Sequence, residues 1–274
     1  MNFIKDIFSK RNRVLLKEMV KTDFKMRYQG SVLGHVWSIL KPLALFAVMY
    51  IVFIRFLRFG QDEPPEAHFA MALLLGTTIW SFFSEAVMQG MNSIVGRGDL
   101  LRKINFPKII VVISSTVGAL INFGINLGVV LIFAIINGVH FEWHMIFAIP
   151  VFIQLYILAL GLALFLGALY VKFRDISHIW EIVMQALFYM VPIIYPLSMV
   201  SKYSFAAAKI LLLNPIAQII QDARSFIIYD KTQTVWTYLN HWYYGLIPIA
   251  LTVIIFTIGL YLFNKNSQKF AEEI

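Results

Sequence analysis

Aromatic side chains are the residues of this sequence whose type and spacing could serve a substrate directly. Trp80 and Phe83 fall in one apolar stretch, and Phe188, Tyr189 and Tyr195 fall in another. Flat aromatic faces stack on the apolar faces of sugar rings and leave the sugar hydroxyls in water. The same rings also pack protein cores. The pattern by itself therefore supports either a sugar path or core packing.

The motifs that catalysis or nucleotide hydrolysis would need are missing from the sequence. It contains no phosphate loop of the form G-x-x-x-x-G-K-[ST], no H-E-x-x-H zinc motif and no cysteine. Two carboxylates, Glu85 and Glu181, fall inside apolar stretches, where ionisable residues usually have a function. They stand alone, so we predict no metal site, no cofactor in this chain and no enzyme activity of its own.

The composition indicates that these residues lie in a membrane. Of the 274 residues, 59% are hydrophobic and only 14% are charged, which is outside the usual range for a soluble domain. Windows of roughly 20 apolar residues can cross the ~30 Å hydrocarbon layer as helices. Six such windows are predicted, at 33–55, 69–91, 109–137, 146–171, 179–200 and 245–264. The expected fold class is therefore an all-α integral membrane protein.

The distribution of positive charge predicts how the spans are oriented. If both termini are cytoplasmic, 17 of the 23 Lys and Arg residues lie on the inner side and six on the outer side. Cytoplasmic loops carry an excess of Lys and Arg, so this bias predicts six spans with both termini in the cytoplasm. The net charge of +8 then reflects membrane topology, and no nucleic-acid partner is expected.

A basic, amphipathic segment precedes the first span. An apolar row recurs every four residues, at Leu16, Val20, Phe24 and Tyr28. A basic row lies about 100° around the same helix, at Arg13, Lys17, Lys21 and Lys25. Such a helix lies along a surface, with its basic row toward anionic headgroups or an acidic protein. The alternative is a charged flank that only fixes the orientation of the first span.

The predicted inner loop, 92–108, mixes apolar and basic residues in a way that a plain linker does not need. Leu100, Leu101 and Ile104 could share one face of a short helix that begins near Asp99 and ends at Pro107. Such a helix could dock on a partner protein. The alternative is a positive loop whose leucines rest on the membrane.

The third and fourth spans carry small and polar residues. Gly124 and Gly128 have the small-xxx-small spacing that permits close helix contact. Asn122 and Asn126 lie in the same span, so a polar pathway is the alternative to helix packing. At the inner end of the fourth span, 174–175 is an Arg-Asp pair, which we expect to form a boundary ion pair or a headgroup contact.

Proline interrupts the chain after the fifth span. The segment 192–196 is expected to break that helix near its outer end, and two apolar segments follow, 205–213 and 216–228, that are too short to span. Asn214 and Pro215 form a helix-start pair, with the asparagine as cap. The pattern predicts two short helices that enter or lie on the outer leaflet. The alternative is an ordinary outer loop with one interfacial helix.

The order of these motifs resembles a known family. The motifs are the segments 24–42, 98–107, 173–176, 192–196 and 214–215, which together extend over essentially the whole chain. In this order they resemble the permease subunits of ABC-2 type exporters of cell-surface polysaccharides, including O-antigen, capsule and teichoic acid exporters. Within that family the sequence looks most like the permeases for rhamnose-rich wall polysaccharides of streptococci.

The resemblance implies an organisation and a set of partners. It divides the chain into a cytoplasmic interface helix (1–31), a six-span transmembrane domain (32–264) with an inner coupling loop (92–108) and outer gate helices (205–228), and a cytoplasmic tail (265–274). It implies a homodimer with two copies of a separate ATPase, which would hold ATP and Mg. This assembly would move an undecaprenyl-linked polysaccharide, such as a rhamnan, outward across the bacterial cytoplasmic membrane.

The resemblance also implies roles for particular residues. Coupling to the ATPase is expected of Phe24, Arg27, Tyr28, Asp99, Leu100, Leu101, Arg102 and Lys103. The substrate path is expected to include Trp80, Phe83, Phe188, Tyr189 and Tyr195. The gate helices are expected to use Asn214, Pro215, Ile219, Asp222 and Arg224, and the inner boundary Arg174 and Asp175. Two alternatives stay open: a polytopic membrane enzyme acting on lipid-linked sugars, and an ABC-2 permease for a small lipid or drug.

Overall fold

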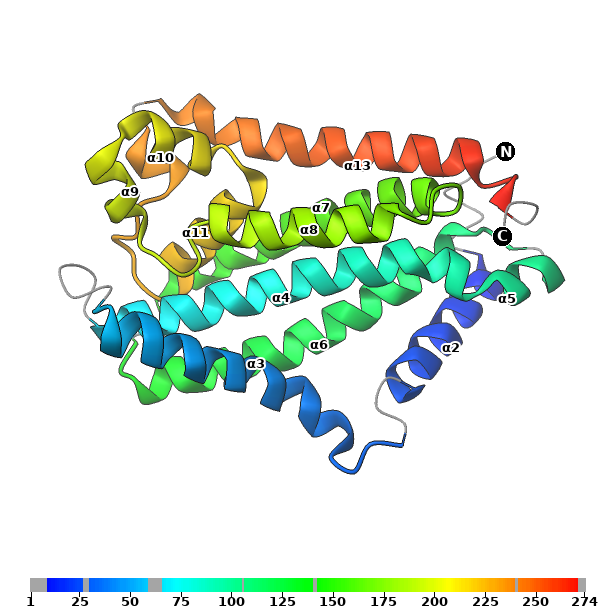
Figure 1. The fold of residues 1–274 in the computed structure, drawn as a ribbon, viewed down its shortest axis with the longest axis horizontal. Helices are drawn as coiled ribbons and strands as arrows, with labels where there is room; N and C mark the ends of the chain where they lie inside the picture. Colours follow the sequence, from blue (N-terminus) through cyan, green and yellow to red (C-terminus); the bar gives the residue numbers. More distant parts are fainter. Residues whose placement is uncertain are drawn as a thin grey trace.

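The structure is a computed structural model that describes residues 9–26, 30–58, 66–104, 106–139, 142–239 and 241–270. Within these ranges the chain forms helices and no strand. Five of the described helices are long and apolar enough to cross a membrane: Trp37–Phe56, His68–Gly96, Ile109–Ile136, Trp143–Tyr170 and Trp242–Asn266. They run along the long axis of the molecule (Figure 1). The prediction of an all-helical, multi-pass membrane protein is confirmed.

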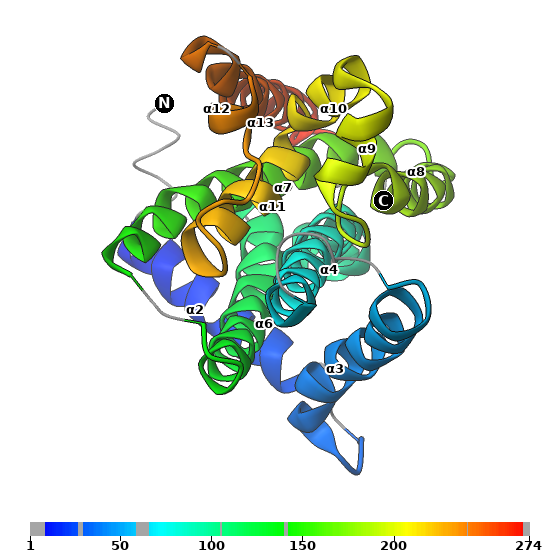
Figure 2. The same ribbon diagram turned by 90° about the vertical axis from the view of Figure 1, so that its left-hand side faces the viewer.

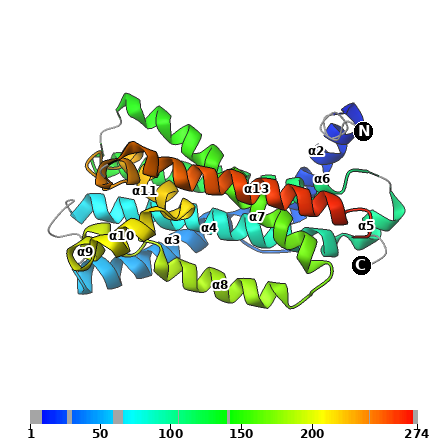
Figure 3. The same cartoon turned by 90° about the horizontal axis from the view of Figure 1, so that it is seen from above.

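Helix α4 (Glu66–Gly96) forms the centre of the bundle. It packs against α6 (Ile109–Ile136) and against α7 (Ala148–Tyr170), and α13 (Leu246–Asn266) packs on α7. Seen from above, α13 and α7 lie over α4, with α6 and α8 toward opposite sides (Figure 3). The largest apolar core follows α4 and the faces that its neighbours turn toward it.

Small residues set the closest helix contacts. Helices α7 and α13 cross at Gly161 and Gly259, where a Cβ added to Gly259 would overlap the carbonyl oxygen of Gly161. Helix α4 approaches α7 at Gly90, whose added Cβ would lie 2.6 Å from a side chain of α7. The predicted close contact at Gly124 and Gly128 is wrong within this chain, because no described atom lies within 4 Å of a Cβ built on either. Both sites on α6 are turned away from its neighbours.

The first span lies at the edge of the bundle. Helix α3 (Trp37–Met49) continues into η2 (Tyr50–Phe56), where the wider turn is closed by a hydrogen bond of 3.0 Å from the Leu57 amide to the Val52 carbonyl. The helix lies beside α4 and α6 but leaves most of its apolar surface exposed (Figure 2). The predicted span 33–55 agrees with these bounds.

The fifth predicted span is shorter in the structure than in the prediction. Helix α8 (Ile176–Met190) has 15 residues, which is about 22 Å of helix and less than the ~30 Å hydrocarbon layer. Val191 is extended, and Pro192 cannot continue the helical hydrogen bonding. The predicted break is confirmed, whereas the predicted boundary near residue 200 is wrong.

Short helices gather at the end of the bundle where α8 breaks off. They are α9 (Leu197–Tyr203), α10 (Phe205–Leu212), α11 (Pro215–Ile227) and α12 (Val235–Tyr238) (Figures 1 and 2). Asn214 caps α11, since its side chain accepts a hydrogen bond of 3.0 Å from the Ile216 amide. The two short helices predicted from 205 onward are thus present, while α9 and α12 were not predicted.

The opposite end of the bundle carries α2 (Lys10–Met26) and α5 (Gly98–Lys103) (Figures 1 and 3). Helix α2 packs on α6 and buries Met19, while its basic row is exposed, as predicted for an amphipathic helix. The predicted coupling residues Arg27 and Tyr28 lie outside the described residues.

Candidate functional site

A polar groove runs between α3, α4 and α6. It has a volume of about 520 Å³, and its polar lining comprises Ser38, Lys41, Thr78, Ser81, Ser84, Glu85, Gln89, Asn122 and Asn126. Met88 and Gln89 also line an adjoining hollow of about 500 Å³ that reaches Asp23 and Arg97 at the α2 end. Polar side chains at membrane depth mark the pathways of hydrophilic ligands. The groove and hollow together extend from mid-bundle to the α2/α5 end.

Glu85 is the charged centre of this groove on α4. Its carboxylate accepts hydrogen bonds from the side-chain amides of Gln89, at 3.2 Å, and Asn122, at 3.1 Å. Asn126 in turn donates to the backbone carbonyl of Asn122 at 2.9 Å. The buried Oδ1 atom of Asn122 has no hydrogen-bond partner among the described residues. A carboxylate surrounded by amide and hydroxyl side chains suits a ligand rich in hydroxyl groups.

An aromatic row connects α4 with α8. The ring centroids of Phe83 and Trp80 are 5.7 Å apart, those of Trp80 and Phe188 are 5.6 Å apart, and those of Phe188 and Tyr189 are 5.4 Å apart. Four of the aromatics predicted for the substrate path are therefore side by side. Exposure rises along the row, from 2% at Phe83 and 8% at Trp80 to 60% at Tyr189. Tyr189 is the member that presents an open face.

Tyr195, the fifth predicted path residue, holds the broken end of α8. Its hydroxyl is within hydrogen-bond distance of the carbonyls of Met190, at 3.0 Å, and Tyr189, at 3.3 Å. The last carbonyls of a helix have no partner within the helix. The Tyr195 hydroxyl therefore completes the end of α8, next to the exposed ring of Tyr189.

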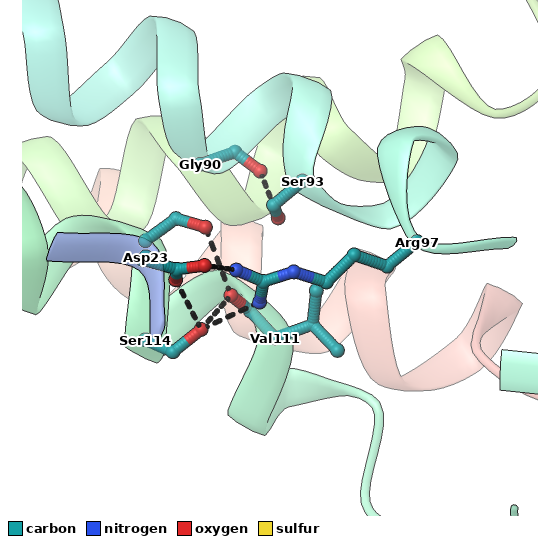
Figure 4. Close-up of polar contacts among 7 residues, drawn as sticks. Asp23, Gly90, Ser93, Arg97, Val111 and Ser114 are labelled. Atoms are coloured by element: carbon teal, nitrogen blue, oxygen red, sulfur yellow. Dashed lines mark hydrogen bonds and ion pairs between the residues drawn. The ribbon is translucent and has the colours of Figure 1, made fainter. Parts of the chain in front are cut away.

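One arginine ties α2 to the bundle (Figure 4). Arg97 lies between α4 and α5, forms an ion pair with Asp23 of α2 and donates to Oγ of Ser114 of α6 at 2.7 Å. Oγ of Ser114 also lies 3.5 Å from the Asp23 carboxylate. Both charged side chains are partly shielded, with exposed fractions of 21% and 28%. Arg97 therefore connects α2 to α6 at the point where α4 meets α5.

Comparison with known proteins identifies the family. Residues 14–228, most of the chain and every element of the groove, match the family model described as ABC-2 type transporter. The chain belongs to the ABC-2 type transporter family. It is also similar to the O-antigen export system permease protein RfbA of Myxococcus xanthus, with 30% identity over 263 residues and 96% of both chains covered. Two proteins of that name from Klebsiella pneumoniae are 25% and 26% identical over 260 residues, with 94% of each chain covered.

Membership of the ABC-2 family makes this chain a transport subunit and not an enzyme. In the described ranges no three His, Asp or Glu side chains come together in a group that could hold a metal ion. The family match, and not this absence, sets aside the alternative of a polytopic membrane enzyme.

In this ABC-2 chain the predicted gate helix α11 is buried on both faces. Ile219 is fully buried on the apolar face of the helix, and Gln218, Gln221 and Asp222, which form its polar face, are buried as well. Buried polar groups need partners. The polar face of α11 thus makes contacts within the protein and does not face solvent.

Arg224 makes most of these contacts. Its guanidinium donates to the carbonyls of Ala72 on α4, at 2.9 Å, and of Pro192 and Ile193 in the break after α8, at 2.6 Å and 2.8 Å. A fourth bond of 2.9 Å goes to the side chain of Gln221. Burial lowers the pKa of Arg224 to about 10, so it stays charged at neutral pH. Arg224 therefore fixes α11 to two other elements.

Asp222 faces a different side of α11. It accepts hydrogen bonds from Gln218 and, at 2.9 Å, from the indole of Trp236, while its other carboxylate oxygen has no partner among the described residues. It lines a cavity between α7, α11 and α13. Burial raises the pKa of Asp222 to about 6.

The predicted coupling residues divide into buried and exposed sets. Leu101 is 5% exposed and packs in the chain's own core with Met19, and Leu100 is half-buried against the same cluster. The expectation that both leucines form an open docking face is therefore wrong for Leu101. The exposed residues of α5 are Asp99, Arg102 and Lys103. Phe24 is half-buried and lines the hollow beside Asp23.

At the inner boundary, Arg174 and Asp175 are both exposed. The guanidinium of Arg174 lies 5.4 Å from the ring centroid of Tyr170, a cation–π distance. No ion pair joins it to Asp175 in the described structure, so the headgroup contact is the expectation that stays open.

Sequence reasoning missed the residues that connect distant elements. Asp23 and Arg97 were not singled out, although Asp23 is an acid inside a basic helix and Arg97 stands between two glycines. Those contrasts were the available signals. Nothing local indicated that the two residues are partners.

Proposed function

We propose that this chain is the permease subunit of an ABC exporter that moves a lipid-linked cell-surface polysaccharide across the bacterial cytoplasmic membrane. Its full-length similarity to proteins named O-antigen export system permease carries the proposal. A separate ATPase subunit hydrolyses ATP, since the chain lacks a phosphate loop. Both termini lie in the cytoplasm, in line with the distribution of Lys and Arg.

The groove supports a sugar as the passing group. Sugar hydroxyls can donate to the Glu85 carboxylate and form hydrogen bonds with the hydroxyls of Ser81 and Ser84 along the groove. Their rings can stack on the open face of Tyr189 or on the edge of the row at Trp80, with each contact on the order of 1 kcal/mol. Contacts this weak allow a long chain to be held and still to advance.

The α2/α5 end is the side on which we place the ATPase. The exposed surface of this chain at that end carries positive charges, with Arg102 and Lys103 on α5 and Lys21 and Lys25 on α2. When the ATPase moves against this surface, it would displace α2. The contacts of Arg97 with Asp23 and Ser114 would transmit that displacement to α6, which lines the groove.

Two copies of the chain complete the pathway in this proposal. Helix α8 is shorter than the hydrocarbon layer and keeps large apolar side chains exposed, among them Ile179, Ile182 and Tyr189. The first span, beside the groove, is also largely exposed. A second copy facing α3 and α8 would enclose the path between the two subunits.

The proposal is tested with the chain and its ATPase purified together and reconstituted in proteoliposomes. We expect ATP turnover to rise with lipid-linked polysaccharide and labelled glycan to cross the membrane. Asn122→Ala should lower glycan export, whereas Asn137→Ala, an exposed amide at the far end of α6, should not. Stimulation by a small lipid or drug, with none by the glycan, would contradict the proposal. Comparing rhamnose-rich with rhamnose-free glycans tests the rhamnan prediction.

A further inference from the structure

Helix α8 exposes a polar stripe on a face that would meet lipid if one copy of the chain stood alone. His178, Glu181 and Gln185 recur at intervals of three and four residues, which places them on one side of the helix, and all three are exposed. None of them forms a hydrogen bond or an ion pair with another described residue. Ionisable side chains at membrane depth are costly unless they face water or a charged partner. The stripe is therefore not a lipid-facing surface.

Lys41 on α3 is in the same situation with the opposite charge. It belongs to the first membrane span and is exposed at the edge of the polar groove. Within the described ranges it makes no hydrogen bond or ion pair. Glu85, the acid of the groove, accepts hydrogen bonds from Gln89 and Asn122 instead. Lys41 and Glu181 are thus opposite charges, and neither finds a partner in the described part of its own chain.

The two charges lie at similar depths in the bundle. Helices α3 and α8 both begin toward the α2/α5 end and run toward the short helices at the other end (Figure 1). At a rise of about 1.5 Å per residue, Lys41 lies about 6 Å beyond Trp37, where α3 begins, and Glu181 lies about 8 Å beyond Ile176, where α8 begins. A parallel α3 and α8 could therefore bring the two side chains level with each other.

The arrangement of the helices provides for such a meeting between two copies. Helices α3 and α8 flank α4 on the same side of the bundle (Figures 2 and 3). A two-fold axis between them, parallel to the bundle, sets α3 of each copy beside α8 of the other and keeps the two helices parallel. Exposed apolar side chains are available to pack around the charges, namely Leu45 and Val48 on α3 and Ile179 and Ile182 on α8.

We propose that Lys41 of each copy forms an ion pair with Glu181 of the partner subunit. The inference rests on the two-copy arrangement of the proposed function and adds the residues that align the copies. Because the contact is isologous, the ion pair forms twice in the dimer, once on each side of the path. Opposite charges at a contact fix its register, since a like-charge alignment is strongly disfavoured.

Cysteine cross-linking tests whether the two positions meet, since the chain has no cysteine of its own. The Lys41→Cys, Glu181→Cys variant is coexpressed with its ATPase, and membranes are treated with a short bis-maleimide, because a disulfide needs Cα atoms within about 7 Å. We expect a covalent dimer. The two single variants, and Lys41→Cys combined with Tyr261→Cys on α13, should stay monomeric. Equal cross-linking in the double variant and these controls would overturn the inference.

Charge reversal tests the ion pair itself. Lys41→Glu and Glu181→Lys should each weaken association of the chain on the order of tenfold, and the combined reversal should restore it. Energy transfer between two labelled copies in lipid vesicles measures this association. Lys265→Glu is the matched control, because it reverses an exposed lysine near the same end of α13.

The alternative is that both side chains extend to lipid headgroups, as long charged side chains near helix ends can do. Wild-type association that neither reversal weakens, or single losses that the combined reversal does not restore, would favour this alternative and overturn the ion pair. Association and cross-linking are measured without transport. A dimer cross-linked through positions 41 and 181 that exports no glycan would therefore count against the proposed function and not against the ion pair.

Discussion

The guanidinium of Arg224 lies against the backbone of α4 at Gly76, where a Cβ would be 2.7 Å from Nη2 of the arginine. Helix α4 can therefore receive Arg224 only because residue 76 has no side chain. Four hydrogen bonds keep the guanidinium from moving aside. A glycine on α4 and an arginine on α11, far apart in the sequence, thus form one contact.

This contact predicts that Gly76→Ala destabilises the protein. The added methyl group must displace the guanidinium, at an expected cost of about 1–3 kcal/mol. Gly124→Ala is the matched control, because a Cβ there meets no described atom and alanine favours the helix. Thermal denaturation of the detergent-purified chain measures both. Equal melting temperatures for the two variants would show that Arg224 relaxes without cost.

The ion pair between Asp23 and Arg97 is expected to couple α2 to the bundle. Asp23→Ala and Arg97→Ala should each lower glycan-stimulated ATP turnover, and the exchange of the two charges should restore part of it. Both groups are partly exposed. We therefore expect a double-mutant cycle to give a coupling energy between Asp23 and Arg97 on the order of 1 kcal/mol, which weakens with added salt. Glu18→Ala, an exposed acid on the same helix, serves as the control. If the effects of the two single substitutions on ATP turnover simply add in the double variant, the ion pair does not couple α2 to the bundle.

Tyr189 is the aromatic that we expect to contact the glycan. Tyr189→Ala should reduce export while assembly with the ATPase persists, and Tyr189→Phe should be close to wild type because stacking needs only the ring. Tyr261→Ala removes a similarly exposed tyrosine from α13, remote from the aromatic row, and should leave export unchanged. Glycan transport into proteoliposomes is the measurement. If Tyr189→Ala exports glycan at the wild-type rate, the aromatic row serves packing and does not contact the glycan.

Single cysteines report the orientation, because the chain has none of its own. Asp230 and Arg102 are both exposed and lie near opposite ends of the bundle. An impermeant thiol reagent applied to intact cells should label Asp230→Cys and spare Arg102→Cys, as the Lys and Arg bias predicts. The reverse pattern of labelling would place the termini outside.

Asp222 predicts a pH-dependent stability. Its pKa is raised from 3.8 to about 6, so the folded state favours the protonated acid. The contribution of Asp222 to the free energy of unfolding is therefore present in full below about pH 4 and is lost as the pH rises through 6. It amounts to roughly 3 kcal/mol at most. The melting temperature should therefore fall between pH 5 and pH 7.5, and fall less in Asp222→Asn. Identical pH profiles for the two proteins would show that Asp222 is not desolvated.

The amino-acid sequence by itself determined the membrane class, the helices and several of their ends. Apolar content and span length depend only on composition along the chain, and a cap such as Asn214 or a break such as Pro192 acts on its nearest neighbours. The amphipathic α2 follows from spacing within one helix. These features were predicted because local interactions decide them.

Only the tertiary structure decided which residues meet across the bundle. Arg97 finds Asp23, and Arg224 finds Ala72 and Gly76, through the relative rotation and depth of whole helices, which no local pattern encodes. The same rotation leaves Gly124 open while Gly161 is in close contact, although both are small residues in apolar spans. The break after α8 turns its carbonyls toward Arg224 and so makes a buried charge acceptable on α11. These contacts depend on how the helix faces fit together.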